Sequence, residues 1–230
     1  MAGCQSAPLK SAETKPLEAA PAGGDEILAT DISFDLETGQ IKYTLPEDAL
    51  VRVRIGLMDG GPLLHHVVDW EKRLKGPHVE TWDRKDAAGK IDFTNRKDMM
   101  LVLGCLPLEE EKRKSYNGLI KGLRKAPQLN VVFPEAVGKT DDGWDIVRGI
   151  APVRINLDEK DKDWLTGTKY EVGMYIDYVF LMEDEEGTNP FTYRLNTVNL
   201  NDGPHLITVN IVGYEGDMGT RSVLVYVKNN

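Results

Sequence analysis

The chain has 230 residues, enough for one large domain or for two of about a hundred residues each. Hydrophobic residues make up 41% and charged residues 28%, which is typical of a globular protein in water, and no apolar stretch approaches the ~20 residues of a membrane-spanning helix. The net charge of -9 and the pI near 5.0 argue against nucleic acid as a partner, because neutralising phosphates requires a basic face.

The first four residues, Met1-Ala2-Gly3-Cys4, resemble the end of a bacterial lipoprotein signal, which typically reads Leu-Ala-Gly-Cys. In that family the cysteine is diacylated and becomes the first mature residue, so the resemblance implies a lipid anchor at Cys4. The charged and apolar parts of a signal peptide do not precede it. Three interpretations stay open: the true start lies upstream, an engineered Met replaces the signal, or the match is accidental.

Residues 1–26 are otherwise predicted to form a flexible tether. Residues 6–24 are rich in Ala and Pro and hold almost no large apolar side chains, so they cannot bury enough surface to offset the entropy of ordering. Such a tether suits an acylated cysteine that holds a domain away from a membrane surface. The alternative is an ordinary frayed terminus.

Residues 27–108 read as short strands separated by turns. Ile32, Phe34 and Leu36 alternate with polar residues before a hairpin turn at 37–40, and a return strand follows over 41–45. In the next strand, Val51, Val53 and Ile55 alternate with Arg52 and Arg54. This alternation predicts a half-buried strand whose two arginines face solvent.

Five features in this region follow one another in a recognisable order: Tyr43–Pro46, the strand 51–55, the Gly60-Gly61 turn, Gly76–His78 and Trp82–Gly89. Together they resemble the immunoglobulin-like module of flagellar hook-capping (FlgD-type) proteins. The resemblance implies a β-sandwich with Trp82 in its core. The chain departs from the module at Arg84, where the module usually has Gly, and at 98–104, where the module has Gly-x-Tyr-x-Tyr.

A second sandwich is predicted over residues 149–230. The sequence Leu200–His205, followed by the apolar strand 206–212, resembles a common bacterial immunoglobulin-like repeat. The predicted fold is therefore all-β, with two tandem immunoglobulin-like antiparallel sandwiches. Residues 109–148 are predicted to connect them, with a short helix over 109–123 and an extra edge strand over 130–134.

Few residues suggest chemistry. Asn156, Asp158, Asp161 and Asp163 could offer oxygen ligands to Ca²⁺, but their spacing misses the EF-hand pattern, so a solvated loop is expected and no metal or cofactor is predicted. His65 and His66 should point to opposite faces of a strand and so cannot share a metal. No nucleophile, phosphate-loop or zinc-protease motif is present, and we expect no enzyme.

These features predict a non-enzymatic lipoprotein of the bacterial cell envelope, anchored in the outer membrane through Cys4 or extracellular. Its expected role is a structural or adhesive interaction module with a protein partner. One alternative is an assembly factor or scaffold for an extracellular polymer or envelope complex. Another is a carbohydrate- or ligand-binding accessory module that uses Trp70 or Trp164, both of which lie beside charges.

Overall fold

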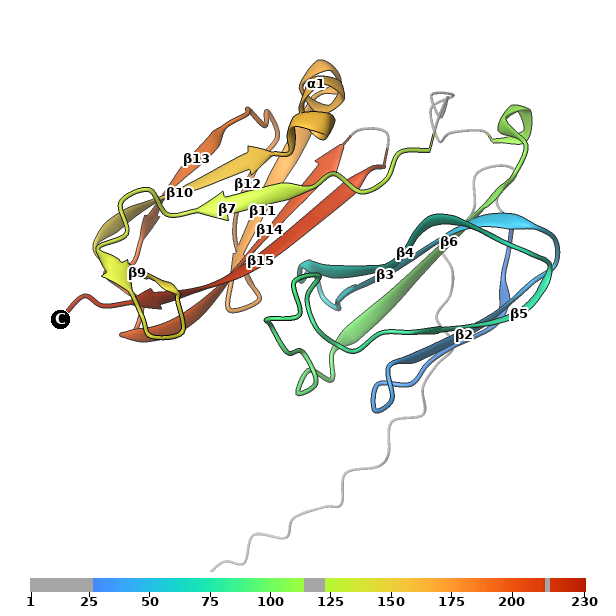
Figure 1. Cartoon of the computed structure of the whole chain (residues 1–230), viewed down its shortest axis with the longest axis horizontal. Coiled ribbons are helices and arrows are strands. Elements are labelled where there is room, and N and C mark those ends of the chain that lie inside the picture. Colours follow the sequence, from blue (N-terminus) through green and yellow to red (C-terminus); the bar gives the residue numbers. More distant parts are fainter. Residues whose placement is uncertain (1–26, 114–122, 214–215) are drawn as a thin grey trace, which may run out of the picture.

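The computed structural model describes residues 27–113, 123–213 and 216–230. Within these ranges, Glu111, Trp164 and Thr168 are described by their backbone only. These residues form two β-sandwich units that lie side by side (Figure 1). The all-β prediction is confirmed. Within the described ranges, no helix is long and apolar enough to cross a lipid bilayer.

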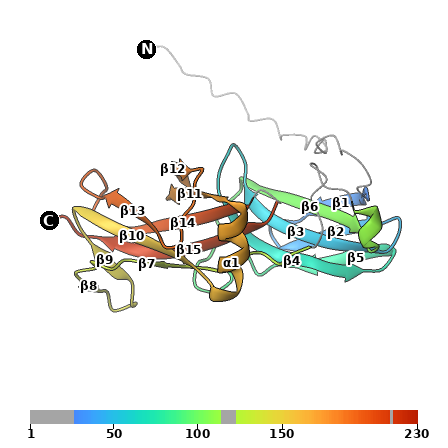
Figure 2. The ribbon, with the colours of Figure 1, turned by 90° about the horizontal axis from the view of Figure 1, so that it is seen from above.

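The first unit packs one three-stranded sheet against another. The order β1-β2-β5 joins Thr30–Phe34, Gln40–Leu45 and Gly76–Thr81, and the order β4-β3-β6 joins Leu63–Arg73, Ala49–Leu57 and Met99–Pro107. All pairs are antiparallel. Figure 2 shows β1 and β6 along one margin of this unit and β4 and β5 along the other.

The core of the first unit lies where the alternating sequence placed it. Val51, Val53 and Ile55 are fully buried, and Trp82 is 2% exposed, as predicted. Gly39 is required beside this tryptophan, because its φ is +72° and a Cβ there would lie 2.0 Å from the Trp82 carbonyl oxygen. One expectation was wrong: Ile32 is 50% exposed, since a register shift between Thr30 and Ser33 breaks the alternation of β1.

The second unit has a three-stranded and a six-stranded sheet. The smaller follows the order β13-β10-β7, namely Phe191–Asn196, Ile150–Leu157 and Leu129–Val132. The larger follows the order β12-β11-β14-β15-β9-β8, namely Val179–Asp184, Tyr170–Ile176, Gly203–Gly213, Met218–Val227, Asp145–Val147 and Gly138–Lys139. β9 runs parallel to β15, and the other pairs are antiparallel.

The segment 109–148 supplies structure to this second unit as well as joining the two. Its strands β7, β8 and β9 pair within the two sheets of the second unit, and β7 is the edge strand predicted over 130–134. The part of the predicted helix that is described contains a single 3-10 turn, η1, Glu110–Lys112. The remainder of that predicted helix, residues 114–122, lies outside the described part of the chain.

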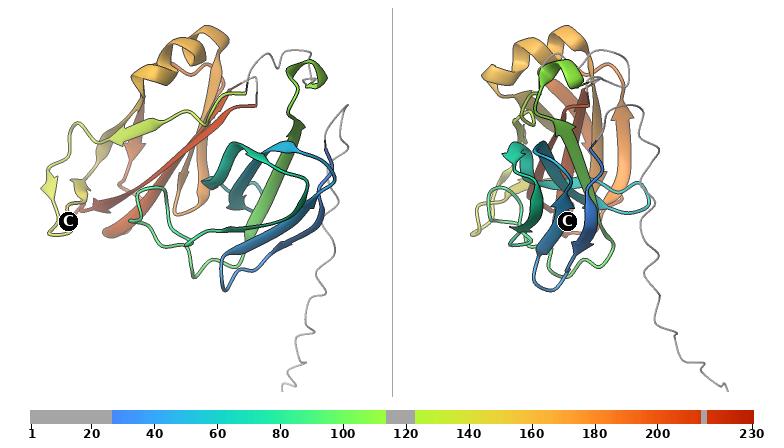
Figure 3. Two further views of the ribbon diagram at one scale, coloured as in Figure 1. Left: turned by 45° about the vertical axis from the view of Figure 1, so that its right-hand side comes forward. Right: turned by 90° about the vertical axis from the view of Figure 1, so that its right-hand side faces the viewer.

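One helix, α1, spans Glu159–Thr168 where the sequence predicted a solvated loop. Asp158 caps it by accepting a hydrogen bond from the Lys160 N–H at 3.1 Å, and Asp161, 8% exposed, accepts one from the Gln128 N–H at 2.8 Å. The helix lies at the end of the second unit where the chain enters it (Figure 3). A helix held by the buried Asp161 therefore replaces the expected loop.

Candidate functional site

The two arginines of β3 do not face solvent, contrary to the prediction. Their strand alternates as expected, with Val51, Val53 and Ile55 in the core, but the opposite face is covered by the second unit and by residues 124–126. Arg52 is 3% exposed as a result. The outer face of β3 is the junction between the two units.

Arg52 joins three segments of the chain at this junction. Its Nε donates to Asp69 Oδ1 at 2.8 Å, its Nη2 to the Arg124 carbonyl at 2.8 Å and its Nη1 to the Gly216 carbonyl at 3.4 Å. Asp69 Oδ2 in turn accepts the Ala126 N–H at 2.6 Å. Burial lowers the pKa of the Arg52 guanidinium, and the Asp69 carboxylate opposes that shift. A buried ion pair thus links β3, β4, the connector and the loop before β15.

A second set of hydrogen bonds fixes the start of β4 to the second unit. The Leu63 N–H donates to Asn210 Oδ1 at 2.8 Å, and the Leu63 carbonyl accepts from Asn210 Nδ2 at 2.9 Å and from Thr220 Oγ1 at 2.7 Å. Asn210 is 5% exposed. The pair of bonds between the Asn210 amide and one backbone residue specifies a relative position as well as a contact.

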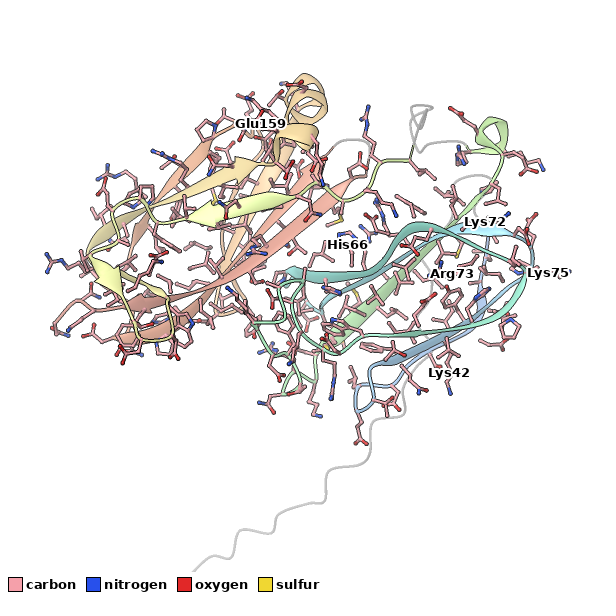
Figure 4. The ribbon with its side chains drawn as sticks, viewed as in Figure 1. Lys42, His66, Lys72, Arg73, Lys75 and Glu159 are labelled. Atoms are coloured by element: carbon pink, nitrogen blue, oxygen red, sulfur yellow. The ribbon has the colours of Figure 1, made fainter. Side chains whose placement is uncertain are left out.

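His66 lies on the side of the first unit that faces the second (Figure 4). Both of its ring nitrogens are buried. Burial lowers the pKa of His66 to about 4; Asp69 and the Met218 backbone oppose that shift, and Arg52 and Arg54 add to it. The histidine is therefore neutral in the junction, and a proton placed on it is disfavoured.

Apolar contacts complete the junction. Leu206 of β14 is 5% exposed and belongs to the core of the first unit, and Leu224 of β15 packs against that core. The ring of Tyr178 lies 6.4 Å from that of Phe93, and the Arg96 guanidinium lies 4.3 Å above its centre. The two units therefore share buried surface, an ion pair and directional hydrogen bonds.

A cleft of about 490 Å³ opens beside this junction, with walls from both units. The first unit contributes the turn 86–91, and the second contributes β7, the β8–β9 hairpin and residues 221–224 of β15. Its volume is within the range of small-molecule sites, about 300–1,000 Å³, which often lie between domains. Its lining includes Lys90, Phe133, Asp142, Trp144 and Arg221.

The charges of the cleft differ in how they are satisfied. Asp86 accepts three backbone N–H groups of its own turn, from Ala88, Lys90 and Ile91. Asp145 pairs with Lys139 at 2.8 Å. Arg221, in contrast, has no ion-pair or hydrogen-bond partner in the described part of the chain, and its Nε atom is buried. The cleft therefore holds a guanidinium whose buried Nε–H has no acceptor within the described ranges.

The acidic residues considered for Ca²⁺ are not brought together. Asp158 caps α1, Asp161 binds the Gln128 backbone, and Asp163 is exposed on the helix. Within residues 27–113, 123–213 and 216–230, no group of three or more His, Cys, Asp or Glu side chains could hold a metal ion. Cys4, the predicted lipidation site, lies outside the described residues.

The paired histidines point to opposite faces of β4, as predicted. His65 stacks on Trp82 at 5.6 Å within the first unit, whereas His66 enters the junction. His205 is tied locally, with Nδ1 at 2.6 Å from Asp177 Oδ2 and Nε2 at 2.9 Å from the Asn201 carbonyl. Although burial opposes it, these hydrogen bonds raise the pKa of His205.

The alternative of a carbohydrate- or ligand-binding module relied on Trp70 or Trp164. The Arg52 guanidinium lies 4.5 Å above the ring of Trp70, so this ring takes part in the junction and one of its faces is covered. The Trp164 side chain is outside the described part of the structure. The tryptophan that lines the cleft is Trp144, in the β8–β9 hairpin.

No protein-family model and no curated protein sequence matches this chain. Among solved structures, it is similar to the endo-beta-1,4-mannanase from Thermotoga petrophila, with 14% identity and a TM-score of 0.32 over 49% of this chain and 22% of that chain. It is also similar to the fibronectin(III)-like modules of Clostridium thermocellum CbhA, with 11% identity and a TM-score of 0.30 over 88% of this chain and 94% of that chain. Similarities this distant carry no argument about function.

Proposed function

We propose that this chain is a non-enzymatic interaction module of the bacterial cell envelope, anchored through acylated Cys4, with a protein partner in the envelope or an extracellular assembly. The observation that supports this most is the junction, where Arg52, 3% exposed, binds Asp69, the connector and the loop before β15. Such a joint holds two sandwiches at one spacing and orientation. A module that must present surfaces to a large assembly needs that constancy.

The hydrogen bonding at the junction supports a mechanical role over a catalytic one. Arg52 and Asn210 are buried polar side chains, and their hydrogen bonds join the two units. A catalytic group needs to reach a substrate, whereas these side chains meet backbone groups of the other segments. A fixed pair of sandwiches on a tether also fits the rival role of a scaffold for an extracellular polymer.

The test uses the gene with its native start, expressed in its bacterial host. Mass spectrometry of the membrane fraction should show a diacylglyceryl group on Cys4, and chemical cross-linking in intact cells should trap one or a few envelope proteins. Cys4→Ser should release the protein from the membrane and lose the cross-links. An unmodified Cys4 in protein that leaves the membrane in a salt wash would refute the anchored role.

A ligand-binding module is a second candidate, because a cleft of about 490 Å³ lies between the units. It combines aromatic side chains with charged groups, the mixture that fixes the orientation of small ligands. Screening the protein against immobilised oligosaccharides tests this role. An absence of binding to all of them by the folded protein would exclude a carbohydrate ligand for the cleft.

A further inference from the structure

The cleft between the two units is lined by an arginine whose buried N–H group lacks an acceptor among the described residues. Arg221 lines it from β15, and the buried Nε–H of its side chain has no hydrogen-bond partner among the residues that are described. A buried donor left without an acceptor costs free energy, roughly 1–3 kcal/mol and more for a charged group. Lys90 adds a second, exposed cation from the opposite wall. An anionic group on a ligand would satisfy both.

Among the described residues, no carboxylate of the cleft is paired with these two cations. Asp86 accepts three N–H groups of its own turn, and Asp145 already has Lys139 as its partner. The remaining carboxylate is that of Asp142, which is exposed at the tip of the β8–β9 hairpin. It can accept hydrogen bonds from hydroxyl groups of a ligand while Arg221 binds the anion.

Most of the other lining residues are apolar, and two of them are aromatic. Phe133 is 7% exposed, Ile91 is 7% exposed, and Trp144 is half-buried beside Asp142. Aromatic side chains offer a flat surface to the apolar face of a ring, and the cleft has room for a few linked rings of modest size. The ligand should therefore present a flat apolar face, hydroxyl donors and a carboxylate within a short distance of one another.

We propose that this cleft binds a sugar acid, that is, a short oligosaccharide whose rings carry carboxylates, with Arg221 and Lys90 on the carboxylate, Asp142 on ring hydroxyls and Trp144 on a ring face. Sugar acids combine all three chemical features in one ring. An inorganic phosphate lacks the apolar face. A peptide of Asp and Glu residues lacks a flat ring face for Trp144. This inference rests on the ligand-binding role proposed above and specifies its ligand class.

The experiment is a calorimetric titration of the full chain with trigalacturonate. A parallel titration uses a neutral trisaccharide of similar size. Binding should be seen for the acid and should be weakened roughly 10- to 100-fold by Arg221→Gln, the loss expected for a charged hydrogen bond. Arg194→Gln is the control, because Arg194 is exposed on β13 and does not line the cleft. Trp144→Ala should weaken binding roughly tenfold, and Trp144→Phe less than that.

The outcomes separate the inference from the role on which it rests. Trigalacturonate binding that Arg221→Gln leaves unchanged, in a variant that melts like the wild type, overturns the site. Binding of the neutral trisaccharide alone overturns the sugar-acid inference but leaves a carbohydrate-binding role. A shift of the Trp144 indole N–H resonance on titration supports the site, and a titration in which acidic peptide or phosphate binds while the sugar acid does not overturns it.

Discussion

Replacing Asp69 with Ala should be among the most destabilising single changes at the junction, although Asp69 belongs to neither hydrophobic core. The variant leaves the Arg52 guanidinium, 3% exposed, without its carboxylate partner, and leaves the Ala126 N–H without its acceptor at 2.6 Å. The charge cannot be relieved by deprotonation, because a guanidinium stays charged even where burial lowers its pKa.

The magnitude follows from the burial of the two partners. Breaking a fully buried ion pair by removing one side costs about 3–5 kcal/mol. The side chain of Asp69 is 18% exposed, so solvent reaches part of the pair and the lower end applies, about 3 kcal/mol. In a protein of this size that loss lowers the melting temperature by roughly 6–12 °C.

Urea unfolding followed by far-ultraviolet circular dichroism measures the free energy, and calorimetry measures the melting temperature. Glu71→Ala is the matched control, since Glu71 lies on the same strand, is 52% exposed and also contacts Arg73 and Lys125. It should cost less than about 1 kcal/mol. Arg52→Met combined with Asp69→Ala should recover part of the loss, because the buried guanidinium is removed together with its ion-pair partner. Equal costs for Asp69→Ala and Glu71→Ala would refute the buried-pair reasoning.

Three further changes probe other contacts. The pKa of His66 is about 4 in the folded protein against an ordinary value of 6.5. The free energy of unfolding of the wild type should therefore fall by up to roughly 3 kcal/mol relative to that of His66→Gln as the pH drops from 6.5 to 4. Urea titrations in which the two proteins keep the same difference across this range would contradict that. Asn210→Ala should cost about 1–3 kcal/mol in urea unfolding and speed hydrogen exchange of the Leu63 amide; an unchanged exchange rate argues against the bond. Gly187→Ala places a Cβ 2.3 Å from the ring of Tyr170 and should lower stability by about 1–3 kcal/mol by calorimetry, whereas a neutral result means that the ring moves freely.

Most of the fold could be predicted from the local alternation of apolar and polar residues along the strands. This alternation placed Val51, Val53 and Ile55 in the core and assigned His65 and His66 to opposite faces, whereas the core position of Trp82 was implied by the resemblance to an immunoglobulin-like module. These features depend on the period of a strand, which side chains a few residues apart reveal. They do not depend on what lies beyond the sheet.

The junction could not be predicted in this way. Alternation shows that Arg52 and Arg54 share a face, but whether water or another unit covers that face is decided by residues far along the chain, such as Arg124 and Gly216. Arg221 was missed for a related reason: it lies on β15, but the cleft that it lines is closed by the turn 86–91, which is far along the chain. Helix α1 did have a signal, since Asp158 is a favoured N-cap residue and acidic residues fill the first turn.

Strand β15 links the junction to the cleft. Successive residues of a strand point to opposite faces, so Thr220, which binds the Leu63 carbonyl, and Arg221, which lines the cleft, are placed by the same register. Leu224 from this strand packs against the first unit, whose turn 86–91 forms the opposite wall of the cleft. The spacing of the two walls is therefore set by the junction bonds. A fixed joint and a preformed cleft follow from one arrangement, so loosening the joint should widen the cleft as well as lower stability.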